Sequence, residues 1–94
     1  MWGWILAGLI ALFLVFLVGL ALSTILSWFQ KNKTVTSEYG ELIKERLSSG
    51  TYRIIGGIFD KRGLKTTEHM WETDKLDDDL KQYFGNRDKV RVEL

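Results

Sequence analysis

The chain has 94 residues, with 13 Lys and Arg, 12 Asp and Glu and one His, so its net charge is +1. This length permits one domain at most, and the balanced charge argues against a nucleic-acid partner, because nucleic-acid-binding domains usually carry a clear basic excess. The absence of cysteine excludes disulfide bonds and thiolate chemistry.

The first long feature is an apolar run over residues 2–29 that contains no charged side chain. Every Lys, Arg, Asp and Glu lies at or beyond Lys31. An uncharged apolar run of about eighteen or more residues is typical of a transmembrane helix, and residues 5–27 would span about 34 Å as a helix against roughly 30 Å of hydrocarbon. The run therefore predicts a single-pass membrane protein, with residues 1–30 as a transmembrane helix with a short N-terminal tail and the lipid bilayer as a partner.

Both ends of this run carry side chains that favour a membrane interface. Aromatic rings suit the headgroup level, and cytoplasmic flanks are enriched in basic residues. The basic pair that follows the run, in a juxtamembrane linker over residues 31–36, predicts an N-terminus outside and a C-terminal domain in the cytoplasm or on the equivalent side. A cleaved signal peptide is the weaker alternative, because no basic residue precedes the run and the run exceeds the usual h-region. The predicted membrane-interface residues are Trp2, Trp4, Trp28, Lys31 and Lys33.

Small residues recur at four-residue intervals within the run. Such a series lets two membrane helices approach closely, although Gly and Ala are also simply common in membrane helices. Both interpretations stay open. The predicted helix-packing residues are Gly3, Ala7, Ala11, Gly19, Ser23 and Ser27.

Residues 37–94 are predicted to form a small soluble α+β domain. Residues 37–48 carry apolar side chains at helical spacing and are followed by Gly50, which predicts an amphipathic helix and its end. Residues 51–59 are rich in β-branched and aromatic side chains, and residues 64–71 follow after a loop that ends in Gly63. This pattern predicts a β-hairpin with the first strand at the centre of the sheet and the second at its edge.

A second helix is predicted after Thr73 or Asp74, with Gly85 as its end, and residues 89–94 alternate between polar and apolar side chains as a strand does. The expected order is helix-strand-strand-helix-strand. The last strand is expected beside the first strand and parallel to the second, which gives a three-stranded sheet in the order 2-1-3.

The motifs that resemble chemical sites have simpler structural explanations. The glycines and Lys65 lack the spacing of a phosphate-binding loop, and residues 77–79 are acidic as expected in the first turn of a helix. His69, the only histidine, has no cysteine companion for a zinc site. No catalytic residue, metal, cofactor or small-molecule substrate is therefore predicted. Trp71, near the end of the predicted edge strand, is the aromatic residue expected to contact a partner.

These features predict a non-enzymatic accessory or assembly subunit. Its helix would pack within a larger membrane complex of integral membrane proteins, and its domain would dock at the cytoplasmic face of that complex. The alternative is a small membrane protein that associates with itself as a homo-oligomer or pore. The third hypothesis is that the protein is an enzyme.

Overall fold

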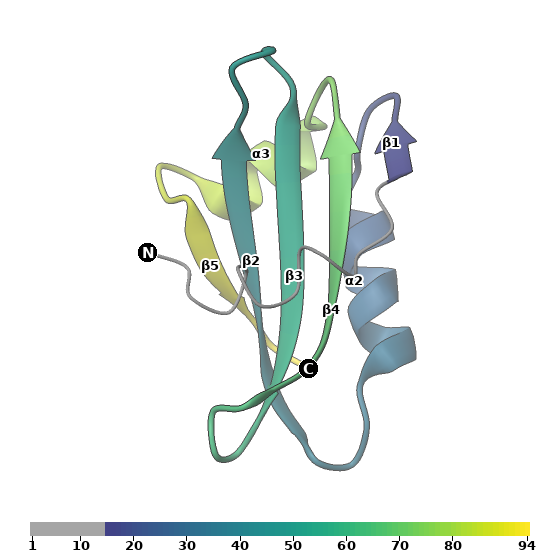
Figure 1. Ribbon diagram of the computed structural model, residues 1–94, viewed down its shortest axis with the longest axis vertical. Helices are drawn as coiled ribbons and strands as arrows, with labels where there is room; N and C mark the ends of the chain where they lie inside the picture. The colour runs from purple at the N-terminus through teal and green to yellow at the C-terminus, as the bar shows by residue number, and fades with distance from the viewer. Residues whose placement is uncertain (1–14) are drawn as a thin grey trace.

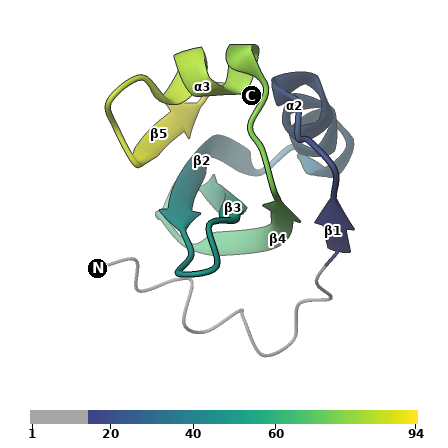
Figure 2. The same cartoon turned by 90° about the horizontal axis from the view of Figure 1, so that it is seen from above.

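The computed structural model of the chain describes residues 15–94. Four strands form an antiparallel sheet, and a short fifth strand, β1, extends it parallel to β4, so that the order is β1-β4-β3-β2-β5. Both helices lie on the same face of this sheet (Figures 1 and 2). The elements in chain order are β1 (Val15–Leu17), α2 (Leu22–Asn32), β2 (Ser37–Arg46), β3 (Tyr52–Asp60), β4 (Lys65–Thr73), α3 (Asp78–Phe84) and β5 (Lys89–Val92).

The predicted β-hairpin is confirmed as β3 and β4. The two strands pair in antiparallel register from Tyr52 with Thr73 to Phe59 with Lys65. Gly63 in the connecting loop has a φ of +78°, a conformation that glycine adopts without steric cost. The strand expected at the centre, β3, does lie in the middle of the sheet, whereas β4 is an interior strand because β1 pairs with its far side.

The predicted helix over residues 37–48 is wrong, because residues 37–46 form β2. This strand lies between β3 and β5, and apolar side chains are buried on both of its faces. Leu42 and Ile43 are neighbours in sequence, and both are fully buried. A strand that is buried on two sides loses the simple alternation that identifies a strand in sequence, and here its apolar positions imitate a helical spacing.

The predicted strand order is also wrong, for the same reason. Because residues 37–46 form a strand, β2 occupies the place beside β3 that was expected for the last strand. β5 instead pairs antiparallel with β2, with Val92 opposite Gly40 and Val90 opposite Leu42. Its predicted alternation is confirmed, since Val90 and Val92 are buried and the residues between and beside them are exposed.

The predicted transmembrane helix is wrong. Residues 15–17 form a strand, Gly19 turns the chain with a φ of +80°, and α2 has only 11 residues. Within residues 15–94, no helix has both the length and the apolar character needed to cross a membrane. Three further predictions are wrong for the same reason. They are the fold class of a single membrane span followed by a three-stranded domain, the description as a single-pass membrane protein, and the location with the N-terminus outside.

Apolar side chains from the C-terminal part of the run, residues 20–29, pack in the core of the α+β fold. Leu20, Ile25 and Phe29 are fully buried or nearly so, and they belong to the same apolar cluster as residues of the sheet and of α3. The backbone of Leu20 is fixed on both sides, since its N–H donates to the carbonyl of Lys75 at 3.0 Å and its carbonyl accepts from the N–H of Asp77 at 3.0 Å. α2 is thus amphipathic: its exposed side includes Ser23, Thr24 and Ser27, among other residues.

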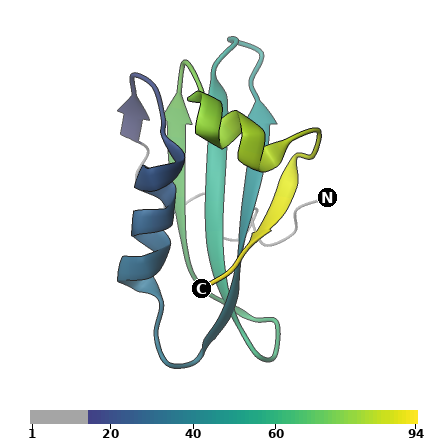
Figure 3. The ribbon, with the colours of Figure 1, turned by 180° about the vertical axis from the view of Figure 1, so that it is seen from behind.

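Phe29 occupies the centre of the core. Two glycines, Gly40 on β2 and Gly56 on β3, leave the space on the sheet that its ring fills. Figure 3 shows α2 and α3 lying side by side over the sheet. The remaining buried apolar residues of this cluster are Leu20, Ile25, Leu42, Ile54, Ile58, Trp71, Leu76, Leu80, Phe84, Val90 and Val92.

The second predicted helix is confirmed in place but is shorter than expected. α3 begins after Asp77, and Gly85 ends it with a φ of +59°. Asp74, which was expected to cap this helix, instead accepts a hydrogen bond from the N–H of Gly19 at 3.0 Å. This bond ties the turn between β1 and α2 to the end of β4.

Candidate functional site

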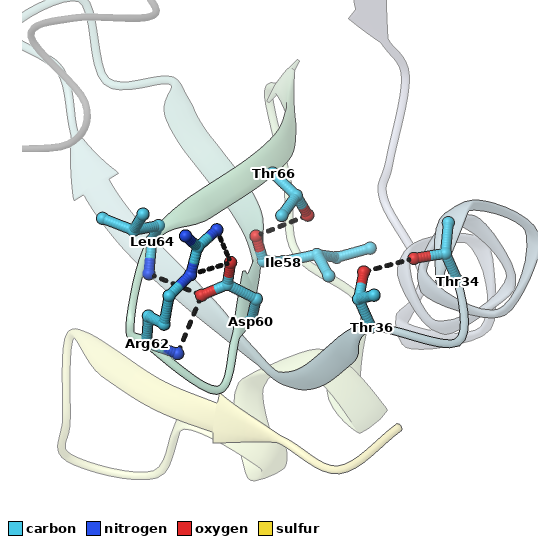
Figure 4. Close-up of polar contacts among 7 residues, drawn as sticks. All are labelled: Thr34, Thr36, Ile58, Asp60, Arg62, Leu64 and Thr66. Carbon is cyan, nitrogen blue, oxygen red and sulfur yellow. Dashed lines mark hydrogen bonds and ion pairs between the residues drawn. The ribbon is translucent and has the colours of Figure 1, made fainter.

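An open pocket lies at the end of the molecule where the loop after α2 meets the β3–β4 hairpin (Figure 4). Its volume is about 520 Å³. Two elements far apart in sequence therefore form its two sides, and both belong to connections between elements, where binding residues are common. The pocket is lined by Val35, Thr36, Asp60, Lys61, Arg62 and Thr66.

The hairpin side of the pocket is organised by Asp60. One carboxylate oxygen accepts hydrogen bonds from the backbone N–H of Arg62 at 2.9 Å and of Leu64 at 3.0 Å. The other accepts from the guanidinium of Arg62 at 3.0 and 3.3 Å. The hydrogen bond from Leu64 and then the contact with Arg62 lower the pKa of Asp60 below its ordinary value of 3.8. Asp60 is thus an ionised structural group that shapes the loop and orients Arg62.

The other side of the pocket is a short segment of hydroxyl side chains. The backbone N–H of Thr34 donates to the hydroxyl of Ser37 at 2.8 Å, and the hydroxyls of Thr34 and Thr36 lie 3.1 Å apart. Between them, Val35 projects fully into solvent. Thr66, across the pocket, donates its hydroxyl to the carbonyl of Ile58 at 3.2 Å (Figure 4). These hydroxyls hold the two loops in shape around an exposed apolar residue.

The pocket combines cationic and apolar side chains, which are suited to binding another molecule. Lys61 and Arg62 supply exposed cationic groups, and Val35 is one of the exposed large apolar residues of the described chain. Sequence reasoning identified the loop over residues 60–63 but singled out none of the lining residues as a site. The available signal was Val35 itself, an isolated apolar residue within a polar connection.

His69 lies within a group of aromatic rings between α2 and β4. Its ring centroid is 4.6 Å from that of Trp71 and 5.7 Å from that of Trp28, and the two indole rings are 5.8 Å apart at 87°. Burial lowers the pKa of His69 below its ordinary value of 6.5. His69 is thus a neutral packing residue at physiological pH.

The structure separates the residues that the sequence grouped as sites. Trp28 packs on the sheet beside His69, and Trp71, the expected partner contact, is buried at 5% exposure. Gly19 forms a turn, and Ser23 and Ser27 are exposed on α2. Lys31 and Lys33 are exposed at the end of α2, next to the loop that lines the pocket. Outside the described residues lie Gly3, Ala7, Ala11, Trp2 and Trp4.

The acidic residues 77–79 lie at the start of α3. Asp78 and Asp79 occupy its first turn, and a carboxylate oxygen of Asp79 lies 2.8 Å from the N–H of Leu80. This placement agrees with the favourable interaction of carboxylates with a helix N-terminus. Among residues 15–94, no three His, Asp or Glu side chains are grouped as metal ligands would be.

Comparison of the chain with protein-family models, with curated proteins and with solved structures finds no match.

The low pKa of His69 predicts a pH-dependent stability. The unfolded chain takes up a proton near pH 6.5, whereas the folded chain does so only at lower pH. The unfolded state therefore binds more protons between these two values, and the free energy of unfolding should fall as the pH drops through 6.5. Urea denaturation at pH 7.5, 6.5 and 5.5 measures this, with His69→Gln as the control that lacks the titrating group. Parallel curves for the two proteins would rule out this role for His69.

Proposed function

We propose that this chain is a non-enzymatic accessory module that binds a partner protein at the hairpin-end pocket. The supporting observation is the combination of a fully exposed Val35 with cationic groups on Lys61 and Arg62 around one open pocket. Exposed apolar side chains beside arginine are typical of protein-binding surfaces. The hydrogen bonds at the pocket add a rigid frame, because Asp60 holds the hairpin loop through four of them.

The pocket favours a partner segment that is both acidic and apolar. Arg62 uses two donor groups on Asp60 and has five N–H donors in all, so other donors are available to a carboxylate. Lys61 is exposed beside it, and Lys31 and Lys33 are close in sequence to the other side of the pocket. An apolar side chain of the partner would pack on Val35.

A charge-reversal experiment tests this function. The full chain is used to probe an array of short peptides that vary in acidic and apolar content. Binding is expected to favour peptides with Asp or Glu next to Leu or Phe, and Val35→Asp combined with Lys61→Glu should weaken it by about tenfold or more, the effect of about 1.4 kcal/mol. Both positions are exposed, and neither carries the hydrogen bonds of the Asp60 loop.

The matched control is Val18→Asp, which also places a carboxylate at an exposed valine outside the pocket lining. It should leave peptide binding unchanged. A wild-type chain that shows no preference for acidic peptides would contradict the proposal. So would equal binding by the wild type, the pocket variant and the control.

A further inference from the structure

β5 forms one edge of the described sheet, opposite the edge that β1 forms (Figure 1). Its partner in the described chain is β2. The N–H of Lys44 donates to the carbonyl of Asp88 at 2.8 Å, and hydrogen-bonded pairs alternate along an antiparallel ladder. Val90 and Val92 therefore bond to β2, whereas the backbone N–H and carbonyl of Arg91 point away from it.

A contact with α3 agrees with this direction of the Arg91 backbone. The hydroxyl of Tyr83 donates to the carbonyl of Arg91 at 3.3 Å. A carbonyl oxygen has two lone pairs, so this bond leaves room for a second donor. The outer edge of β5 thus offers a backbone donor and a backbone acceptor to another strand, as edge strands do.

Two side chains of opposite charge, Arg91 and Glu93, lie beside this edge. Both are exposed, and neither forms an ion pair within the described part of the chain. The guanidinium of Arg91 lies 4.0 Å from the ring centroid of Tyr39, and this contact orients the cation. Burial and then the charge of Glu93 raise the pKa of Tyr83, so the carboxylate of Glu93 also lies near the outer edge.

We propose that this edge pairs with the same edge of a second copy of the chain. An antiparallel pair of β5 strands related by a two-fold axis at Val92 places Arg91 of each copy opposite Glu93 of the other. Opposite charges directly across two strands stabilise their pairing. The axis makes this contact twice, and it joins the sheets of the two copies into one continuous sheet.

The charges favour this register over its neighbours. The residues that can exchange backbone hydrogen bonds across the new interface are those whose backbone groups point outward, so the adjacent registers move the axis by one residue. An axis at Arg91 would place two arginines directly opposite each other, and an axis at Glu93 would place two glutamates there. Like charges in that position are unfavourable. The axis at Val92 avoids both conflicts.

The apolar side chains and the space around the strand are compatible with the same register. On the side of the sheet that the helices cover, the axis at Val92 places Val90 of each copy opposite Leu94 of the other, and both contribute to the apolar core or pack against it. The ladder with β2 ends at Val92, and Glu93 and Leu94 beyond it line an open hollow of about 340 Å³. The side chains of a second strand can therefore be accommodated there.

Sedimentation equilibrium of the full chain in buffer without detergent tests this pairing. The wild type should show a reversible equilibrium between monomer and dimer, because a two-fold contact closes on itself. Arg91→Glu makes both charge pairs repulsive and should weaken dimerisation by about tenfold or more, and Glu93→Arg should do the same for the same reason. Arg87→Glu is the matched control, because Arg87 is exposed and lies before β5, outside the paired residues. It should leave the dimer unchanged.

The two weakened variants together give the decisive measurement. Mixed in equal amounts, they should dimerise about as strongly as the wild type, because the acidic strand of one then faces the basic strand of the other. The double variant Arg91→Glu with Glu93→Arg, which exchanges the two charges, should dimerise again as well. Either recovery also shows that the single variants are folded.

Three results would overturn the proposal. The first is a wild-type chain that stays monomeric up to about 1 mM, which would leave the edge of β5 to a strand of another protein. The second is a dimer that Arg91→Glu and Glu93→Arg do not weaken, or a loss that their mixture does not reverse. The third is assembly beyond a dimer, because the two-fold contact leaves no β5 edge for a third copy.

Discussion

Phe29→Ala is expected to lower the free energy of unfolding by about 3–5 kcal/mol, the usual cost of removing a buried aromatic ring. The ring is 0% exposed, it lies over Gly40 and Gly56, and it meets Trp28 edge to face at a centroid distance of 5.0 Å. Because Gly40 and Gly56 shape the space that the ring fills, neither of these two positions has a side chain that could move into the cavity. This loss would approach the whole stability of a small domain, which is about 5–15 kcal/mol.

Urea denaturation of the full chain, followed by far-ultraviolet circular dichroism, measures this effect. Val35→Ala is the control, because Val35 is fully exposed and its truncation should change the free energy of unfolding by about 0.5 kcal/mol or less. If Phe29→Ala costs no more than Val35→Ala, then α2 does not contribute to the core and the arrangement of the fold is incorrect.

Gly40→Ala is expected to destabilise the fold although the backbone at this position tolerates alanine. The added Cβ would lie 2.5 Å from Cε1 and 2.9 Å from Cδ1 of Phe29, and 3.2 Å from Cβ of Val92. Contacts this short require the ring or the strand to move, and overpacking of a core typically costs about 1–3 kcal/mol. Without this clash the change would be favourable, because glycine inside a strand costs about 0.5–1 kcal/mol relative to alanine.

Two comparisons separate the clash from a general loss of stability. Gly56→Ala should have a smaller effect, because its nearest contacts, at 3.2 Å to Phe29 and 3.3 Å to Trp71, need a shift of only a few tenths of an ångström. Adding Phe29→Leu to Gly40→Ala should recover part of the loss, so that the two changes are non-additive. A stabilising Gly40→Ala, or strict additivity with Phe29→Leu, would contradict the packing of the ring against this glycine.

The β3–β4 hairpin was predictable from sequence because its signals are local. β-branched residues, a short loop and a glycine at a position of positive φ all occur within about twenty residues of each other. β2 was not predictable in the same way. Its adjacent residues Leu42 and Ile43 are buried on opposite faces of the sheet, and the spacing of Leu42, Ile43 and Leu47 is compatible with a helix until that burial is known.

The apolar run was wrongly predicted to be a membrane helix because its polar residues are uncharged. α2 exposes Ser23, Thr24 and Ser27, which a membrane helix also accommodates, so no charge marks the solvent side of the helix until Lys31. The partner of β1 is β4, more than fifty residues further along the chain. Pairing at that distance leaves no local pattern, and Gly19 marks only the turn between β1 and α2.

The candidate pocket could not be predicted from the sequence because its lining comes from two loops that are far apart in the chain. Val35 and Arg62 are brought to one pocket by the antiparallel pairing of β2 with β3, which places the start of β2 beside the end of β3. The composition of each loop alone is ordinary.

The central claim is that the apolar run is interrupted and packs on the sheet. Backbone chemical shifts of the isotope-labelled full chain, recorded in buffer without detergent, test it most directly. The structure predicts extended shifts for Val15–Leu17, a break at Gly19 and helical shifts for Leu22–Asn32. Uninterrupted helical shifts over residues 5–27 would contradict this account.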